Sequence, residues 1–208
     1  MKINRFYKDL QLDLIRAENE NLLSFETWFN NPFVLSSDIE NYRFPLSFLE
    51  IYQKSDGMRI QWEATNIEQA YGGMEFLAME AILSSWEGSV YEPEDLEFNE
   101  MLEFFHPFDQ VSPEILCGFM ITPNETYQSI YLNGVGETDT PFLDLNFDGY
   151  VTMLYESRAY KNWPIILLNI SDNDLDSPLI QDFRSDMPPL FPEFDWDRYV
   201  TRYQSLRL

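Results

Sequence analysis

The chain has 208 residues, of which 45% are hydrophobic and 16% aromatic, and this composition excludes an intrinsically disordered protein. Its single cysteine, Cys117, excludes an intramolecular disulfide and is expected to pack as a small buried hydrophobe. No apolar stretch approaches the ~20 residues of a membrane span, and the N-terminus lacks the apolar segment of a signal peptide. We therefore expect a soluble, cytoplasmic protein.

The charge of the chain is strongly acidic and unevenly distributed. It carries 36 acidic and 13 basic residues, a formal net charge of −23. Between Arg59 and Arg158 there are 19 Asp and Glu residues and no Lys or Arg. Such a surface repels DNA, RNA and anionic lipids, whereas it attracts basic proteins. The charge either maintains solubility alone or serves a basic partner, and composition does not separate the two.

The N-terminal part of the chain is predicted to contain two helices and a strand. Apolar and aromatic side chains recur over residues 15–30 at roughly helical spacing. A second helix begins at Pro45, where the missing N–H costs nothing, and ends at Asp56-Gly57, with Gly57 free to adopt a left-handed cap. Residues 58–63 alternate apolar and polar side chains, which predicts a strand with one buried face.

The middle of the chain is interpreted as strands, tight turns and short helices. Gly72-Gly73 is expected to form a turn that leads into a short strand, followed by a helix over residues 78–86. Residues 92–108 mix charged and aromatic side chains, and one side of a helix is expected to carry Leu96, Met101, Leu102 and Phe105. The segments 115–122 and 129–133 are predicted strands.

The C-terminal part is predicted to begin with a hairpin over residues 142–155. Residues 163–170 form either a buried strand or a short helix, because periodicity does not distinguish these. An acidic, proline-rich loop follows, and a final helix over 195–206 is expected to be capped by Asp195. Together these elements predict a single α+β domain spanning residues 1–208, with a mainly antiparallel sheet wrapped by helices.

One stretch, "DLNFDGYVTMLYE", resembles the first half of a calcium-binding loop, through Asp144, Asn146, Asp148 and Gly149. The twelfth position of such a loop needs a bidentate glutamate, and here it is Tyr155. The flanking residues also alternate as in strands, so we interpret Asp148-Gly149 as a type I′ hairpin turn. A second acidic run, residues 172–176, lacks the glycine and the later glutamate and is interpreted as a solvated loop.

Few residues of the chain suggest catalysis. His106 is the only histidine, and it lies in an aromatic run before a proline, which favours a packed or surface side chain. The sequence contains no phosphate-binding glycine loop and no zinc-ligand spacing. We predict no catalytic, cofactor-binding or metal-binding residues. A glycosidase-like pair of carboxylates is left open, although no particular pair stands out.

The segment "FPLSFLEIYQKSDGMRIQWE" resembles the signature of the SUKH superfamily, which is a proline-started helix, a glycine turn and an alternating strand. The residues in those roles are Pro45, Phe48, Leu49, Tyr52, Gly57, Ile60 and Trp62. Residues 73–82 are similar to the family's next strand and helix, and "FDGYVTMLY" is similar to its later Asp-Gly hairpin. The resemblance spans roughly residues 42–155, with the C-terminal helix as a further candidate.

The resemblance implies a non-enzymatic α+β domain and brings no catalytic residues with it. SUKH proteins act mostly as immunity proteins that bind bacterial toxins, often nucleases or deaminases, and some are interaction modules of signalling scaffolds. Structural turn roles are implied for Gly57, Asp148 and Gly149. These expectations agree with the acidic charge, since a basic toxin would be attracted to it.

The sequence therefore predicts an immunity protein whose partner is a basic toxin domain. A scaffold module and, less favoured, a carboxylate-based hydrolase are the alternatives. The predicted contact surface is the acidic tract between residues 91 and 100, in which two aromatic side chains serve as anchors among five acids. A solvated helix face or loop is the competing interpretation of this tract. Its predicted contact residues are Tyr91, Glu92, Glu94, Asp95, Glu97, Phe98 and Glu100.

Overall fold

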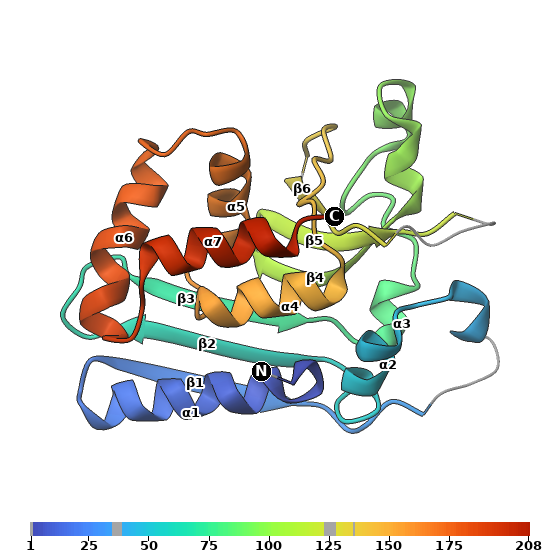
Figure 1. Cartoon of the computed structure of the whole chain (residues 1–208). Coiled ribbons are helices and arrows are strands. Elements are labelled where there is room, and N and C mark those ends of the chain that lie inside the picture. The colour runs from blue at the N-terminus through green and yellow to red at the C-terminus, as the bar shows by residue number, and fades with distance from the viewer. Residues whose placement is uncertain (1, 35–38, 123–127, 135) are drawn as a thin grey trace.

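The computed structural model describes residues 2–34, 39–122, 128–134 and 136–208 (Figure 1). The strands are β1 (Leu23–Phe29), β2 (Met58–Ala64), β3 (Tyr71–Phe76), β4 (Phe105–Ser112), β5 (Ile115–Met120) and β6 (Tyr131–Gly134). The α-helices are α1 (Phe6–Asn19), α2 (Leu46–Tyr52), α3 (Met79–Ile82), α4 (Phe147–Glu156), α5 (Trp163–Ser171), α6 (Pro178–Leu190) and α7 (Trp196–Leu206). Short 3-10 helices are η1 (Ile3–Arg5), η2 (Ile39–Tyr42), η3 (Pro93–Glu97) and η4 (Glu100–Phe104).

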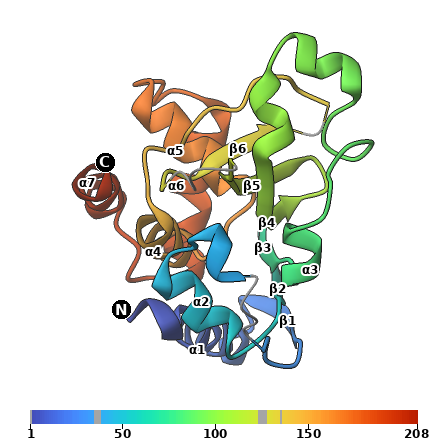
Figure 2. The same ribbon diagram turned by 90° about the vertical axis from the view of Figure 1, so that its right-hand side faces the viewer.

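The six strands form one sheet in which the spatial order follows the chain order, from β1 at one edge to β6 at the other. Every neighbouring pair is antiparallel. The helices α1, α4, α5, α6 and α7 lie on one side of this sheet (Figures 1 and 2). The predicted α+β architecture with an antiparallel sheet is therefore confirmed.

The predicted alternation of β2 determines which side of the sheet carries the main core. Met58, Ile60 and Trp62 are at most 4% exposed and belong to the main hydrophobic cluster beneath the helices. The intervening side chains of Arg59 and Gln61 lie on the opposite side. Because side chains alternate along a strand, one face of β2 is buried and the other remains in contact with solvent.

Four phenylalanines hold α2 and α4 against the middle of the sheet. Phe48, Phe108, Phe119 and Phe147 have all six ring-centroid distances between 4.9 and 6.1 Å. Most of these rings meet at steep angles, the arrangement that aromatic quadrupoles favour. Since these residues come from α2, β4, β5 and α4, the cluster links segments that are distant in the sequence.

A second, smaller core lies on the other side of the sheet, under residues 86–104. It contains Phe105, Leu116 and Met120, packed against Val90 and Leu102. The predicted helix over 92–108 is wrong, because η3 and η4 are two short turns and β4 begins at Phe105.

The predicted N-terminal helix over 15–30 is also wrong. The helix α1 ends at Asn19, and Asn21 adopts a left-handed φ of 58°. The aromatic residues that follow belong to β1, which pairs with β2 along its whole length. Over so short a stretch their spacing fits both the helical period and the strand period. Pairing with β2 decides in favour of the strand.

Gly72 and Gly73 lie inside β3, so the predicted turn at these residues is wrong. Gly72 is opposite Trp62, whose Nε1 donates to the carbonyl of Arg158 at 2.7 Å. The N–H of Gly73 donates to the carbonyl of Ala159 at 2.7 Å. The missing side chain at Gly72 thus allows the chain after α4 to approach the sheet closely.

We expect Gly72→Ala to lower the free energy of unfolding by about 1–3 kcal/mol, the usual cost of forcing atoms into a packed core. An added Cβ at Gly72 would lie 2.4 Å from the carbonyl oxygen of Ala159, whereas at Gly73 the nearest atom would be 3.3 Å away. Gly73→Ala is therefore the matched control, with an expected loss below about 1 kcal/mol. Urea denaturation measures both, and equal losses would contradict this account.

The predicted hairpin at Asp148-Gly149 is wrong, because both residues lie in the first turn of α4. The side chain of Asn146 accepts a hydrogen bond from the N–H of Gly149 at 2.9 Å, which caps the helix. The turn role expected for Asp148 and Gly149, and with it the SUKH-like hairpin, is therefore absent here. Gly57 does adopt the left-handed region, with φ of 88°, but α2 already ends at Tyr52, so the predicted helix end at Asp56-Gly57 is wrong and Gly57 lies in the turn before β2.

The remaining C-terminal elements divide between confirmed and wrong predictions. Residues 163–171 form the helix α5, which resolves the alternative left open there. The expected proline-rich loop is instead largely α6, capped by Ser177. The helix α7 is confirmed, and Asp195 accepts from the N–H of Arg198 at 2.7 Å. Of the helix predicted over residues 78–86, only Met79–Ile82 is helical, as α3.

Candidate functional site

The side of the sheet opposite the helices is uncovered over β1, β2 and β3. Figure 2 shows the helices α4, α6 and α7 on one side of the strands and the green segment around residues 86–104 on the other side, beside β4. None of the outward-facing residues of β1, β2 and β3 is buried. We call this surface the open face; it consists of Ser24, Glu26, Trp28, Arg59, Gln61, Glu63, Tyr71, Gly73 and Glu75.

The strand register arranges the open face in three rows that run across the strands. One row contains Ser24, Glu63 and Tyr71. The next contains Glu26, Gln61 and Gly73, and the third contains Trp28, Arg59 and Glu75. Because side chains directly opposite on neighbouring strands are in contact range, each row acts as a unit.

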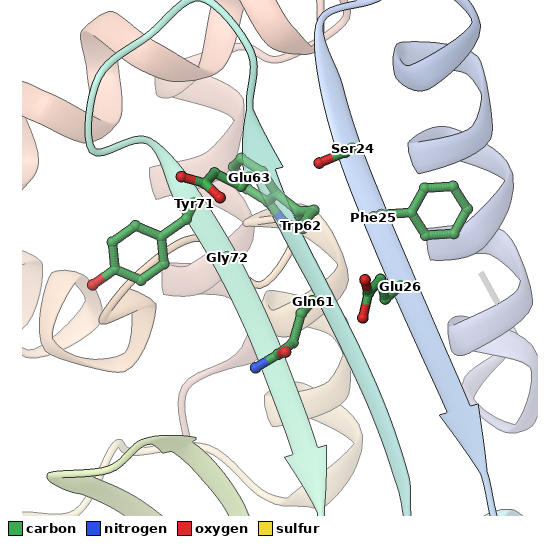
Figure 3. A pocket seen from close by; sticks show the side chains of 8 residues that line it. All are labelled: Ser24, Phe25, Glu26, Gln61, Trp62, Glu63, Tyr71 and Gly72. Atoms are coloured by element: carbon green, nitrogen blue, oxygen red, sulfur yellow. The ribbon is translucent and has the colours of Figure 1, made fainter.

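A shallow hollow of about 460 Å³ lies on the open face (Figure 3). The side chains of Glu26, Gln61, Glu63 and Tyr71 stand around it. A second hollow of about 270 Å³ shares Gln61 and Tyr71 with the first and continues toward β4. The two hollows are therefore neighbours, with Tyr71 and Gln61 lining both.

Trp28 is the largest aromatic side chain on this surface, and it is held in place. Its side chain is 48% exposed, and the guanidinium of Arg59 lies 5.4 Å from the ring centroid. Arg59 Nε is in turn 3.5 Å from a carboxylate oxygen of Glu75. An exposed aromatic residue that is already ordered loses little conformational entropy on binding.

The open face is acidic on balance. Glu26, Glu63 and Glu75 carry negative charge, and Arg59 is the only basic residue among the nine. Beside it, Lys161 Nζ lies 6.0 Å from the ring of Tyr71 and 3.4 Å from a carboxylate oxygen of Asp182. The face therefore has the charge that attracts basic groups and repels anionic ones.

The predicted contact residues of the acidic tract occupy different environments. Tyr91 is only 9% exposed and packs in the second core, so it is not an exposed anchor as predicted. Phe98 is 80% exposed. The carboxylate of Asp95 accepts from the N–H of Glu92 at 2.8 Å and caps η3. The other acidic side chains of the tract are exposed, namely Glu92, Glu94, Glu97 and Glu100.

The tract lies on the same side of the sheet as the open face but covers β4 and β5 instead (Figure 2). The open face is not among the surfaces predicted from the sequence. The signal was available in β2, where Arg59, Gln61 and Glu63 alternate with buried residues. The residues of the partner strand β1 are predicted to be helical, and the helical pattern gives no outward face that contains both Glu26 and Trp28.

The residues that resembled a calcium loop have protein partners. Asp144 Oδ2 is 2.6 Å from Nε of Arg207, Asn146 caps α4, and Asp148 accepts a hydrogen bond from Ser47. Within the described ranges, no group of three or more His, Cys, Asp or Glu side chains is placed to hold a metal ion. Residues 172–176 form the predicted exposed loop after α5, apart from any strand or helix.

The buried groups Asp109 and Cys117 lie in the interior, away from the open face. Asp109 is fully buried, accepting from the N–H of Glu75 at 3.0 Å and from the hydroxyl of Tyr150 at 2.7 Å. Burial raises the pKa of Asp109 to about 7. Cys117 is buried as predicted, and half-buried His106 is held by the carbonyl of Ile82, 2.7 Å from Nδ1.

Comparison with known proteins gives no relative. No protein-family model matches the chain, and neither the curated proteins nor the solved structures contain a match. In the described part of the chain, no helix has both the length and the apolar character needed to cross a membrane.

Proposed function

We propose that this chain is a non-enzymatic binding domain that acts in the cytoplasm as an immunity protein, holding a basic toxin domain against the open face. The observation that carries the proposal is an uncovered, concave and acidic sheet surface with a pre-ordered tryptophan in one of its three rows. The SUKH-like segment around Pro45–Trp62 supports the same class of function.

The open face combines the two properties that such an inhibitor needs. Trp28 and Tyr71 are each 48% exposed, and aromatic side chains dominate the binding energy of protein interfaces. The net charge of −23 steers a basic partner and accelerates its association. In this arrangement the acidic tract contributes long-range attraction, and Trp28 contributes a short-range contact.

We expect Trp28→Ala to weaken binding of the basic partner at least tenfold, because truncation of an interface tryptophan removes a central contact. Phe98→Ala is the matched control, since Phe98 is an even more exposed aromatic residue but lies on the acidic tract. The probe is a toxin domain encoded beside this gene, and the readouts are titration calorimetry and rescue of growth on co-expression. Binding should also weaken with increasing salt.

Each outcome has a distinct meaning. Loss of toxin binding with Phe98→Ala but not with Trp28→Ala would place the contact on the acidic tract. That result would overturn the open face as the binding surface. A complex without growth rescue would favour the scaffold-module alternative. If the wild-type chain neither binds the toxin nor rescues growth, the immunity proposal is refuted.

A further inference from the structure

The strand β1 forms an edge of the sheet, and its register determines which backbone groups point outward. The N–H of Thr65 donates to Leu22 O at 2.8 Å, and the N–H of Asn30 donates to Gly57 O at 3.3 Å. Hydrogen-bonded pairs alternate along an antiparallel ladder, so the even-numbered residues of β1 bond to β2. The N–H and C=O groups of Phe25, Thr27 and Phe29 therefore point away from the sheet.

This edge lacks several of the features that usually prevent further strand pairing. No hydrogen bond within the described part of the chain reaches the outward backbone groups of Phe25, Thr27 or Phe29. The pairing of β1 with β2 runs from Leu23 to Phe29 without a bulge. The strand also contains no Lys and no Pro. Natural edge strands are commonly blunted by such residues or by bulges, and β1 is therefore available as a template.

We propose that β1 receives an extended segment of the basic partner as an additional antiparallel strand, and that this segment alternates Lys or Arg with apolar residues. The proposal rests on the proposed function and specifies its binding mode. Addition of a strand to a sheet edge supplies backbone hydrogen bonds for affinity, while the alternating side chains supply specificity.

The two faces of β1 specify the alternation. On the open face, Glu26 and the 48%-exposed ring of Trp28 favour a cationic side chain, through an ion pair and a cation–π contact. On the helix side, Phe29 is 41% exposed and Phe25 is half-buried, pointing toward α1 in Figure 3. These favour an apolar side chain. The incoming segment therefore needs basic and apolar residues in turn.

A second copy of this chain is a less suitable occupant. Glu26 is the central residue of β1, so symmetric antiparallel pairing of two β1 strands about their centres would place Glu26 against Glu26. Each copy would also bring a net charge of −23. Like charges opposed in this way are destabilising, whereas a basic segment is attracted.

The test uses two seven-residue peptides that alternate Lys and Val and differ only in backbone methylation. The outward N–H groups of β1 belong to residues whose side chains face α1. In an antiparallel sheet, two residues that exchange hydrogen bonds have their side chains on the same side. In the bound peptide the valines therefore face α1 and bond to β1 through their N–H groups. The probe therefore carries N-methyl groups on its lysine amides. The control carries them on its valine amides and has the same charge and composition.

We expect the probe to bind at least tenfold more tightly than the control. It should also slow hydrogen exchange at the amides of Phe25, Thr27 and Phe29. Thr27→Pro should abolish the difference between the peptides, because its N–H faces outward and proline is tolerated there. Thr27→Val is the control variant that keeps the N–H, and circular dichroism verifies that both variants fold.

The outcomes separate this inference from the proposed function. Equal binding of the two peptides, with Trp28→Ala weakening both, would overturn strand addition and leave the open face as the binding surface. Toxin binding that is insensitive to both Thr27→Pro and Trp28→Ala would refute the inference and the open face together. A concentration-dependent dimer that is lost in Thr27→Pro would identify a second copy as the occupant and overturn the proposal.

Discussion

Replacement of Arg158 with methionine is expected to lower the free energy of unfolding by about 3–5 kcal/mol, the usual cost of leaving one member of a buried ion pair alone. Arg158 Nη2 lies 3.0 Å from Asp13 Oδ2, and the two side chains are only 7% and 8% exposed. The hydroxyl of Tyr155 also donates to Asp13 at 2.9 Å. The pair therefore joins α1 to the end of α4 inside the protein.

Urea denaturation of four variants tests this expectation: the two single changes, their combination and one control. Asp13→Asn combined with Arg158→Met should cost less than the sum of the two single changes, because each single change leaves a buried charge with only an exposed partner, Arg16 for Asp13 and Glu193 for Arg158. Glu193→Gln is the matched control: Glu193 is 3.2 Å from the same guanidinium, but its side chain is 52% exposed. Its expected loss is below about 1 kcal/mol. A control loss as large as that of Arg158→Met would contradict the buried-pair account.

Asp109→Asn is expected to make stability less dependent on pH, and to stabilise the protein above pH 7. Burial raises the pKa of Asp109 from 3.8 to about 7, so the folded state retains a proton that the unfolded state has lost. The contribution of Asp109 to the free energy of unfolding is fully present below about pH 4 and falls as the pH rises toward 7. At 1.36 kcal/mol per pKa unit, the total loss is on the order of 4 kcal/mol.

The measurement is the free energy of unfolding of wild type and of the Asp109→Asn variant at pH 5 and pH 8. Relative to wild type, the free energy of unfolding of the variant should be higher at pH 8 than at pH 5 by about 3 kcal/mol, because asparagine does not ionise. Asp139→Asn, at an exposed acid, controls for the general charge of the chain. A pH-independent difference between wild type and Asp109→Asn would show that Asp109 is already ionised at pH 5.

Several elements follow from short stretches of sequence because their signals are local. The helix α2 after Pro45, the alternation of β2 and the Asp195 cap of α7 each depend on residues within one or two turns. For the same reason the isolated signals at Asp148-Gly149 and Gly72-Gly73 misled. A dipeptide is compatible with a turn, a helix start or a strand, and distant contacts choose among these.

The candidate site was only partly predictable. Acidity and a basic partner are expected from composition, and the basic partner remains a prediction here. The open face required the pairing of β1 with β2, which brings Trp28 beside Arg59 across 31 positions of sequence. The acidic neighbours of Tyr91 predict an anchor, whereas its burial is decided by packing against β4 and β5.

The sequence by itself determined the α+β class, the negative charge and the alternating burial of β2, because these depend on composition and on periodicity along one segment. Only the tertiary structure decided which sheet face stays uncovered, which edge of β1 is unpaired, and that Asp109 and Arg158 are buried. Those properties arise when segments far apart in the chain exclude water from one another. No local pattern of residues records that exclusion.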